Sequence, residues 1–184
     1  MSTLTLIDNS GLITQAHHVP SPNFDRRPDP DDISLLVIHN ISLPPGQFGG
    51  DEICALFCNQ LDPTQHPFFS EIAELKVSAH LLINRQGELT QFVPFHKRAW
   101  HAGHSCFSGR EQCNDYAIGI ELEGTDNTPY TEAQYAMLTD VTMLIMQHYP
   151  VITTERITGH ETIAPERKTD PGPAFDWNHY LGML

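Results

Sequence analysis

A hairpin pattern in residues 78–95, SAHLLINRQGELTQFVPF, places the strongest limit on the fold of this 184-residue chain. Two β-like runs flank the sequence Arg85-Gln86-Gly87, and Gly87 suits the tight turn between them. Strands joined by such a turn pair in antiparallel orientation. A sheet that contains this hairpin therefore cannot be purely parallel.

Other segments predict strands and helices that alternate along the chain. SLLVIHN, residues 34–40, is a short apolar and β-branched run, and AIGIELEG, residues 117–124, is predicted as a strand after a long polar loop at 98–115. Helical spacing of apolar residues predicts helices at 49–60, 66–76, 131–148 and 175–184, with Thr131 and Asp176 as caps. We therefore predict an α/β (α+β) fold in which residues 1–184 form a single domain, a mixed central β-sheet flanked by helices.

Charge and hydropathy argue against several classes of function. Ten Lys and Arg against 23 Asp and Glu give a net charge of −13, which disfavours binding to nucleic acid or to anionic membranes. No window approaches the roughly 18 consecutive apolar residues that span a bilayer. Residues 1–18 lack the basic and apolar regions of an export signal. The expected protein is cytoplasmic and monomeric, with no nucleic-acid or membrane partner.

Four cysteines, Cys54, Cys58, Cys106 and Cys113, do not follow the CxxC spacing typical of structural zinc sites. Without an export signal they are predicted to be reduced and inert thiols. A zinc site built from all four is the alternative. Cys106 is not favoured as a nucleophile, because cysteine catalysis needs an activating environment that sequence does not display.

A proline-rich segment near the C-terminus, HETIAPERKTDPGPAFDW, carries candidate metal ligands. Its prolines rule out one continuous helix, which predicts a loop. His160 and Asp170 lie in this segment, and His39 ends the apolar run LLVIH, where it would leave the core. Two imidazoles and one carboxylate are the ligand set of a catalytic zinc ion whose fourth position is left to water. For His39 alone, the alternative is a polar side chain whose hydrogen bonds are satisfied within the fold.

Alternation along AIGIELEG singles out Glu121. In a strand, Gly119, Glu121 and Glu123 face one side, and Gly119 leaves room for another group to approach. The alternative is an ordinary half-buried strand with its acidic face in water. The same rule places Lys168 on the side of Asp170 in an extended segment, the alternative being a solvated surface lysine.

HAGH, residues 101–104, and His80 compete as ligands in a chain with eleven histidines. Neither comes with an acid in a stiff loop. We therefore predict pocket-lining or structural roles for His80, His101 and His104.

Four ordered blocks, VIHNISLPPGQFGG, SAHLLINRQGELTQFVPFHKRAWHAGHS, GREQCNDYAIGIELEG and GHETIAPERKTDPGPAFDW, resemble the cytoplasmic N-acetyl-anhydromuramyl-L-alanine amidases of peptidoglycan recycling. These enzymes belong to the zinc amidase family shared with phage lysozyme-type amidases and peptidoglycan recognition proteins. The resemblance implies hydrolysis of the amide between the muramyl lactyl group and L-alanine in a soluble anhydromuropeptide. It further implies that one zinc ion per chain is bound by His39, His160 and Asp170, that Glu121 is the catalytic acid and base, and that Lys168 polarises the scissile amide.

The resemblance also implies that a substrate groove is lined by Asn40, Lys76, Trp100, Arg110 and Ala164. Two positions depart from the family pattern: Gln112 stands where relatives often carry a basic residue, and Lys76 stands where arginine is expected. Lysine lacks the bidentate fork of arginine, so the grip on a stem-peptide carboxylate is expected to differ.

Three other functions are open to such a chain: a non-catalytic muropeptide-binding module, a wall-lytic amidase acting on intact peptidoglycan, and a structural zinc protein. A binding module would be marked by loss of a ligand, and a structural site by four protein ligands. This chain keeps the three candidate ligands together with Glu121 and Lys168, which favours the enzyme.

Overall fold

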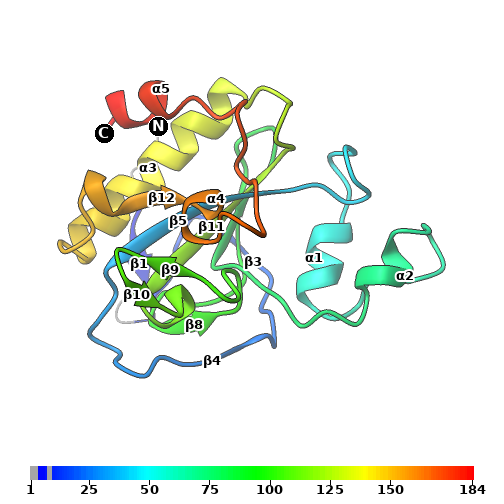
Figure 1. Cartoon of the computed structure of the whole chain (residues 1–184), viewed down its shortest axis with the longest axis horizontal. Helices are drawn as coiled ribbons and strands as arrows, with labels where there is room; N and C mark the ends of the chain where they lie inside the picture. The colour runs from blue at the N-terminus through cyan, green and yellow to red at the C-terminus, as the bar shows by residue number, and fades with distance from the viewer. Residues whose placement is uncertain (1–3, 8–9) are drawn as a thin grey trace.

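A six-stranded mixed sheet forms the centre of the computed structural model, which describes residues 4–7 and 10–184 (Figure 1). Residues 1–3 and 8–9, which belong to the predicted domain 1–184 and to the segment analysed for an export signal, lie outside the described residues. The strand order is β12 (Ile157–Gly159), β5 (Leu35–Ile41), β11 (Ala117–Glu123), β6 (Leu81–Ile83), β7 (Leu89–Gln91) and β3 (His17–His18).

The pairing of β6 with β7 is antiparallel, and the other neighbouring strands of this sheet pair in parallel. Gly87 adopts a positive φ of 79° in the turn between β6 and β7, a conformation that glycine reaches without a steric cost. The predicted hairpin, mixed sheet and α/β class are therefore confirmed.

Two helices, α3 (Glu132–His148) and α5 (Trp177–Gly182), cover one face of the sheet (Figure 1). The Thr131 hydroxyl accepts a hydrogen bond from the backbone of Gln134, whose side chain in turn contacts the backbone of Thr131, and the Asp176 carboxylate caps α5. Both caps were predicted. The core beneath these helices joins strand and helix residues, among them Leu81, Ile118, Ile120, Leu138, Val141, Ile145 and Tyr180.

Short helices α1 (Glu52–Phe57) and α2 (Phe69–Ile72) pack over the other face, to the right of the sheet in Figure 1. Their apolar side chains form a second core with the sheet, which includes Leu56, Phe57, Phe69, Leu82 and Val93. A third cluster joins Leu35 and Val37 of β5 to Ala102, Cys113, Tyr116 and Ile163.

The predicted loop at 98–115 contains regular structure. Its first residues belong to β8 (Lys97–Ala99), which pairs with β4 (Phe24–Arg26), and it continues through the small hairpin of β9 (Cys106–Phe107) and β10 (Arg110–Glu111) into the 3-10 helix η1 (Cys113–Asp115). Other short elements are the β1 (Leu6–Ile7) and β2 (Leu12–Ile13) pair and the 3-10 helix η2 (Thr154–Arg156). Pairings of two or three residues leave no periodic signal in sequence, which is why they were missed.

The segment that begins at His160 is also not a simple loop, because its first four residues form the one-turn helix α4 (His160–Ile163). The helix ends before Pro165, in keeping with the prediction that no continuous helix passes through the prolines.

All seven residues of β11 are buried. The strand lies between β5 and β6, and both of its faces are covered. The interpretation of its acidic face as a solvated surface is therefore wrong, although the predicted alternation of side chains is correct.

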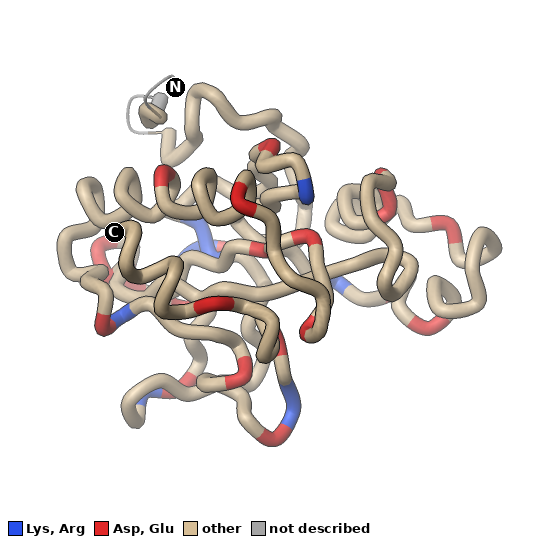
Figure 2. Tube along the Cα trace, turned by 90° about the horizontal axis from the view of Figure 1, so that it is seen from above, with Lys and Arg blue, Asp and Glu red and all other residues tan. Residues whose placement is uncertain are grey.

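Acidic positions are distributed over the trace rather than gathered at one element (Figure 2). Among the described residues, no helix has the length and apolar character to cross a bilayer.

Candidate metal and catalytic site

Three side chains converge at the end of β5. His39 lies near the end of this strand, His160 directly follows β12, and Asp170 is in the loop beyond α4. Because β12 pairs in parallel with β5, with Gly159 opposite Ile38, the pairing brings His160 next to His39. The distance between the two Nδ1 atoms is 3.0 Å, and Asp170 Oδ2 lies 3.1 Å from Nδ1 of His39 and 3.0 Å from Nδ1 of His160.

These spacings fit one small cation. An ion with tetrahedral bonds of about 2.0–2.1 Å holds its ligand atoms about 3.3 Å apart, close to the distances between the three atoms. The imidazoles of His39 and His160 are only 1% and 3% exposed, whereas the Asp170 side chain is 13% exposed, which leaves access beside the carboxylate. In the described part of the chain, His39, His160 and Asp170 form the group of potential metal ligands whose donor atoms converge. The group contains no cysteine.

The charge states of this group suit metal binding. Burial lowers the pKa of His39 to about 4, with the hydrogen bond to Asp170 acting in the opposite direction, so the imidazole is neutral near pH 7. Burial acts to raise the pKa of Asp170, but its close contacts with the rings of His160 and His39 outweigh burial and hold this pKa below its usual range. A neutral imidazole and an ionised carboxylate are the forms in which these side chains bind metals.

Glu121 projects from β11, and its backbone lies opposite His39 in the parallel pairing. Its side chain is buried, and Oε2 has no hydrogen-bond partner among the described residues. Burial, reinforced by the charge of Asp170 and opposed by Lys168, raises the pKa of Glu121 well above its ordinary value. A buried carboxyl group that retains a proton easily is suited to act as a general acid and base.

A cavity of about 230 Å³ joins the predicted residues. His39, Glu121, His160, Lys168 and Asp170 all line it. Asn40 and Trp100, which the resemblance placed in a substrate groove, line it too, and its apolar wall is formed by Ile41, Phe57, Leu75 and Val77.

The other predicted groove residues are not among those that line this cavity. Lys76 is exposed and stands in the sequence between Leu75 and Val77, which both line the cavity. Ala164 is buried at the end of α4. Arg110 forms a 2.6 Å ion pair with Asp32, and its guanidinium lies 3.8 Å from the centre of the Tyr116 ring. Substrate contacts of Lys76, Arg110 and Ala164, and the consequence of Gln112, stay predictions.

The other histidines considered as ligands, and the four cysteines, lie outside the converging group. The four cysteines form no disulfide, and their sulfur atoms do not converge on a common point, so the four-cysteine zinc site is wrong. His80 is fully buried away from the cavity lining, His104 is exposed, and His101 lines the cavity and contacts His39. Sequence analysis missed this contact, although the room noted at Gly119 was a signal for it.

The fold and the site together describe an α/β domain in which the converging side chains and Glu121 line a cavity at the carboxyl ends of parallel strands. The chain belongs to the N-acetylmuramoyl-L-alanine amidase family, whose model it matches over residues 29–173. It is 60% identical to the 1,6-anhydro-N-acetylmuramyl-L-alanine amidase AmpD of Enterobacter cloacae, over 97% of this chain and 95% of the relative. Identity to the AmpD of Escherichia coli (strain K12) is also 60%, over 95% of this chain and 94% of the relative.

Solved structures agree with this assignment. A crystal structure of a selenomethionine derivative of AmpD superimposes with a TM-score of 0.94 at 56% identity, and the match covers 97% of this chain and 99% of that one. The fold predicted from sequence is thus that of the family, and family membership assigns amidase activity to the chain.

Proposed function

We propose that this chain is a zinc-dependent amidase of peptidoglycan recycling, which hydrolyses the amide between the lactyl group of 1,6-anhydro-N-acetylmuramic acid and L-alanine in soluble muropeptides. The observation that carries the proposal is the convergence of two imidazoles and a carboxylate in one cavity with buried Glu121, whose Oε2 has no hydrogen-bond partner among the described residues. The substrate comes from the names of relatives that are 60% identical over nearly the whole chain. Cytoplasmic location and a monomeric state stay predictions from sequence.

In this mechanism His39, His160 and Asp170 would hold the ion. Zinc, when bound, supplies a Lewis acid that lowers the pKa of water and polarises a carbonyl group. Glu121 accepts a proton from the attacking water and returns it to the nitrogen of the leaving L-alanyl peptide. Its burial supports the second transfer, since a raised pKa favours holding the proton until the amine departs.

Lys168 is assigned to the carbonyl oxygen of the scissile amide. Its side chain lines the same cavity as Glu121 and the ligand set, and its ammonium group can donate to the oxygen as negative charge develops there. Asn40 and Trp100 are assigned to the sugar, and Lys76, Arg110 and Ala164 to outer parts of the groove, on the family resemblance.

A metal-removal experiment tests the chemistry. Chelation should abolish turnover and leave most of the fold intact, because the ligands come from one strand end and the segment from His160 to Asp170. Addition of zinc should restore turnover, with circular dichroism recorded throughout. Full activity in a preparation verified as metal-free would overturn the mechanism, and a folded zinc protein without turnover would instead be the non-catalytic binding module.

A second experiment tests the substrate. At equal enzyme concentration, release of L-alanyl peptides is compared for a purified anhydromuropeptide, its reducing-sugar counterpart and insoluble sacculi. The anhydromuropeptide should be preferred. Comparable efficiency on sacculi would contradict the recycling assignment and identify a wall-lytic amidase.

A further inference from the structure

The dipeptide His101–Ala102 lies directly behind the two imidazoles of the ligand set. His39 Nε2 is 2.9 Å from His101 Nδ1, and the two rings meet edge to face with centroids 5.0 Å apart. His160 Nε2 is 3.2 Å from the backbone oxygen of Ala102. In both ligand histidines, the nitrogen turned away from the ligand cluster is therefore engaged by the same dipeptide.

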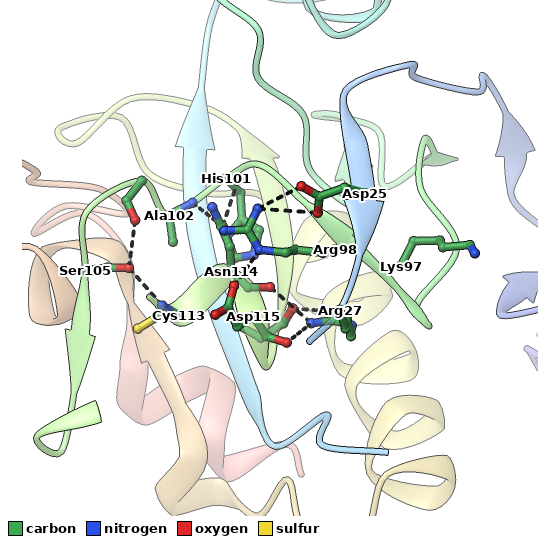
Figure 3. A network of polar contacts seen from close by, with 12 residues as sticks. Asp25, Arg27, Lys97, Arg98, His101, Ala102, Ser105, Cys113, Asn114 and Asp115 are labelled. Carbon is green, nitrogen blue, oxygen red and sulfur yellow. Dashed lines mark hydrogen bonds and ion pairs between the residues drawn. The ribbon is translucent and has the colours of Figure 1, made fainter. Parts of the chain in front are cut away.

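This dipeptide is held firmly. Asn114, in η1, accepts hydrogen bonds through Oδ1 from the backbone N–H of His101 and of Ala102, at 3.1 and 2.8 Å (Figure 3). The guanidinium of Arg167 donates to the oxygen of Ala102 at 2.8 Å. The backbone from which the His101 ring projects is thus fixed by contacts outside the ligand set.

Gly119 makes room for the His101 ring. A Cβ atom at this position of β11 would lie 2.5 Å from both Cγ and Nδ1 of His101, closer than nonbonded atoms approach. A side chain on Gly119 would therefore push the imidazole off His39. Glycine at position 119 therefore allows the His101 ring to contact the candidate ligand His39.

The two contacts select one tautomer of each ligand. A metal bound through Nδ1 needs the lone pair of that atom, so the proton of the neutral imidazole must be on Nε2. The Ala102 oxygen can only accept, which fixes the proton of His160 on Nε2. His101 Nδ1 can accept from His39 Nε2, because no described residue bonds to His101 Nε2 and so holds His101 in the opposite tautomer.

We propose that His101 is a positioning residue for metal binding, which accepts a hydrogen bond from His39 Nε2 and so turns a free Nδ1 lone pair of His39 toward His160 and Asp170. The inference rests on the proposed function, since it presumes the zinc ion. The acceptor is a neutral imidazole in place of the carboxylate often found behind a metal-bound histidine. His101 therefore orients His39 without adding negative charge to the site. An ion of charge +2 with one carboxylate ligand would then keep a net positive charge, which polarises the substrate.

The test compares His101→Leu with His101→Asn. Leucine fills the space without an acceptor, whereas the Oδ1 atom of asparagine can accept where Nδ1 does. Zinc affinity is measured by competition with a chromophoric chelator, and the visible spectrum of the cobalt-substituted protein reports ligand geometry. His101→Leu should bind zinc about 10–100-fold more weakly with an altered cobalt spectrum, and His101→Asn should recover most of the loss.

Two further variants sharpen the comparison. His104→Leu changes the exposed histidine of the same HAGH segment and should match the wild type in both measurements. Gly119→Ala removes no polar group but displaces the His101 ring, and it should also weaken zinc binding. Melting temperatures of all variants, recorded without metal, identify any effect that comes from unfolding.

The outcomes separate the two proposals. Wild-type affinity and an unchanged cobalt spectrum in His101→Leu overturn the inference and leave the amidase mechanism intact. Equal losses in His101→Leu and His101→Asn also overturn it, because ring packing and not hydrogen-bond acceptance would be responsible. A wild-type protein that binds no zinc overturns the proposed function itself.

Discussion

Glu121 and Glu123 show how residues on the same face of one strand acquire different uses. Both are buried on β11. The Glu123 carboxylate accepts hydrogen bonds from the backbone N–H groups of Gly49 and Arg85, at 2.5 and 3.0 Å, and so joins two loops to the sheet. Glu121 Oε2 has no such partner among the described residues and borders the cavity. Alternation predicts where both carboxylates point, whereas their partners decide which one is free to transfer protons.

Replacement of Glu121 by glutamine should separate metal binding from proton transfer. The amide cannot accept the proton of the attacking water, so we expect turnover to fall by about 10²–10⁴-fold with zinc content unchanged. Zinc content and turnover are measured on the same sample. As controls, Asp170→Ala should lose the metal, and Glu123→Gln should lower stability without slowing the chemical step. Loss of zinc from Glu121→Gln would make Glu121 a ligand.

Replacement of Lys168 by alanine should slow the chemical step more than it weakens substrate binding. The ammonium charge matters most when the carbonyl oxygen becomes negative, and loss of one such donor costs about 10²–10³-fold in rate. Single-turnover rates, measured with enzyme in saturating excess over substrate, report the chemical step directly. Lys168→Arg, which keeps the charge, should retain part of this rate. Weaker binding with an unchanged single-turnover rate would reduce Lys168 to a docking group.

At the scale of elements, sequence patterns identified the long strands, the hairpin and α3, because these carry their own periodicity. The patterns did not identify β12 or its place beside β5, although this pairing sets His160 next to His39. A three-residue strand has too few positions to show alternation, and its partner lies far away in the chain. The ligand residues were found because of their chemical types, and the resemblance to the amidases fixed their roles.

The contact between His101 and His39 illustrates a second limit. Gly119 was recognised as a gap in the strand, but nothing in the sequence says which side chain fills a gap. That choice depends on Asn114, which fixes the backbone of the loop through a side-chain oxygen. Contacts of this kind are set by tertiary structure and have no local pattern.

The N-cap of α3 provides a prediction at this scale. The Thr131 side chain accepts from the backbone of Gln134 and donates to the backbone oxygen of Arg85 at 2.9 Å, so it joins the helix to the β6–β7 turn. Thr131→Ala should lower the free energy of unfolding by about 1–2 kcal/mol, and Thr131→Ser should keep most of it. Urea denaturation measures both variants. Since α3 covers the face of the sheet away from the cavity, turnover of the folded enzyme should not change in either variant.

For the molecule as a whole, Arg27 and His80 join segments from across the chain. The guanidinium of Arg27 donates to backbone oxygens of Phe95, Asn114, Asp115 and Ala117. Figure 3 shows Arg27 beside Asn114 and Asp115. Burial lowers the pKa of Arg27 to about 10, which leaves it charged near neutrality. His80 accepts from the Gly119 N–H at 3.0 Å and donates to the Lys97 oxygen at 3.0 Å, with an Arg27 nitrogen 3.2 Å away.

These contacts require a neutral His80. A second ring proton would point at the Gly119 N–H, and the added charge would be buried beside Arg27. Burial, followed by the charge of Arg27, lowers the pKa of His80 to about 3, against about 6.5 in an unfolded chain. Between these values the unfolded state binds a proton that the folded state does not. The stabilisation is therefore complete above about pH 6.5 and is lost as the pH falls toward about 3.

Acid denaturation should report this single site. In metal-free protein, the free energy of unfolding is measured by urea titration between about pH 4 and 6, where one such histidine contributes a slope of up to about 1.4 kcal/mol per pH unit. His80→Gln, which loses the titration but keeps a donor and an acceptor, should show a slope smaller by about this amount, whatever its stability at neutral pH. His17→Gln, at an exposed histidine of β3, should keep the wild-type slope. Other buried imidazoles such as His39 titrate in both proteins, so their contributions to the slope cancel in the comparison. Equal slopes for wild type and His80→Gln would show that His80 is not the neutral buried group inferred from its contacts.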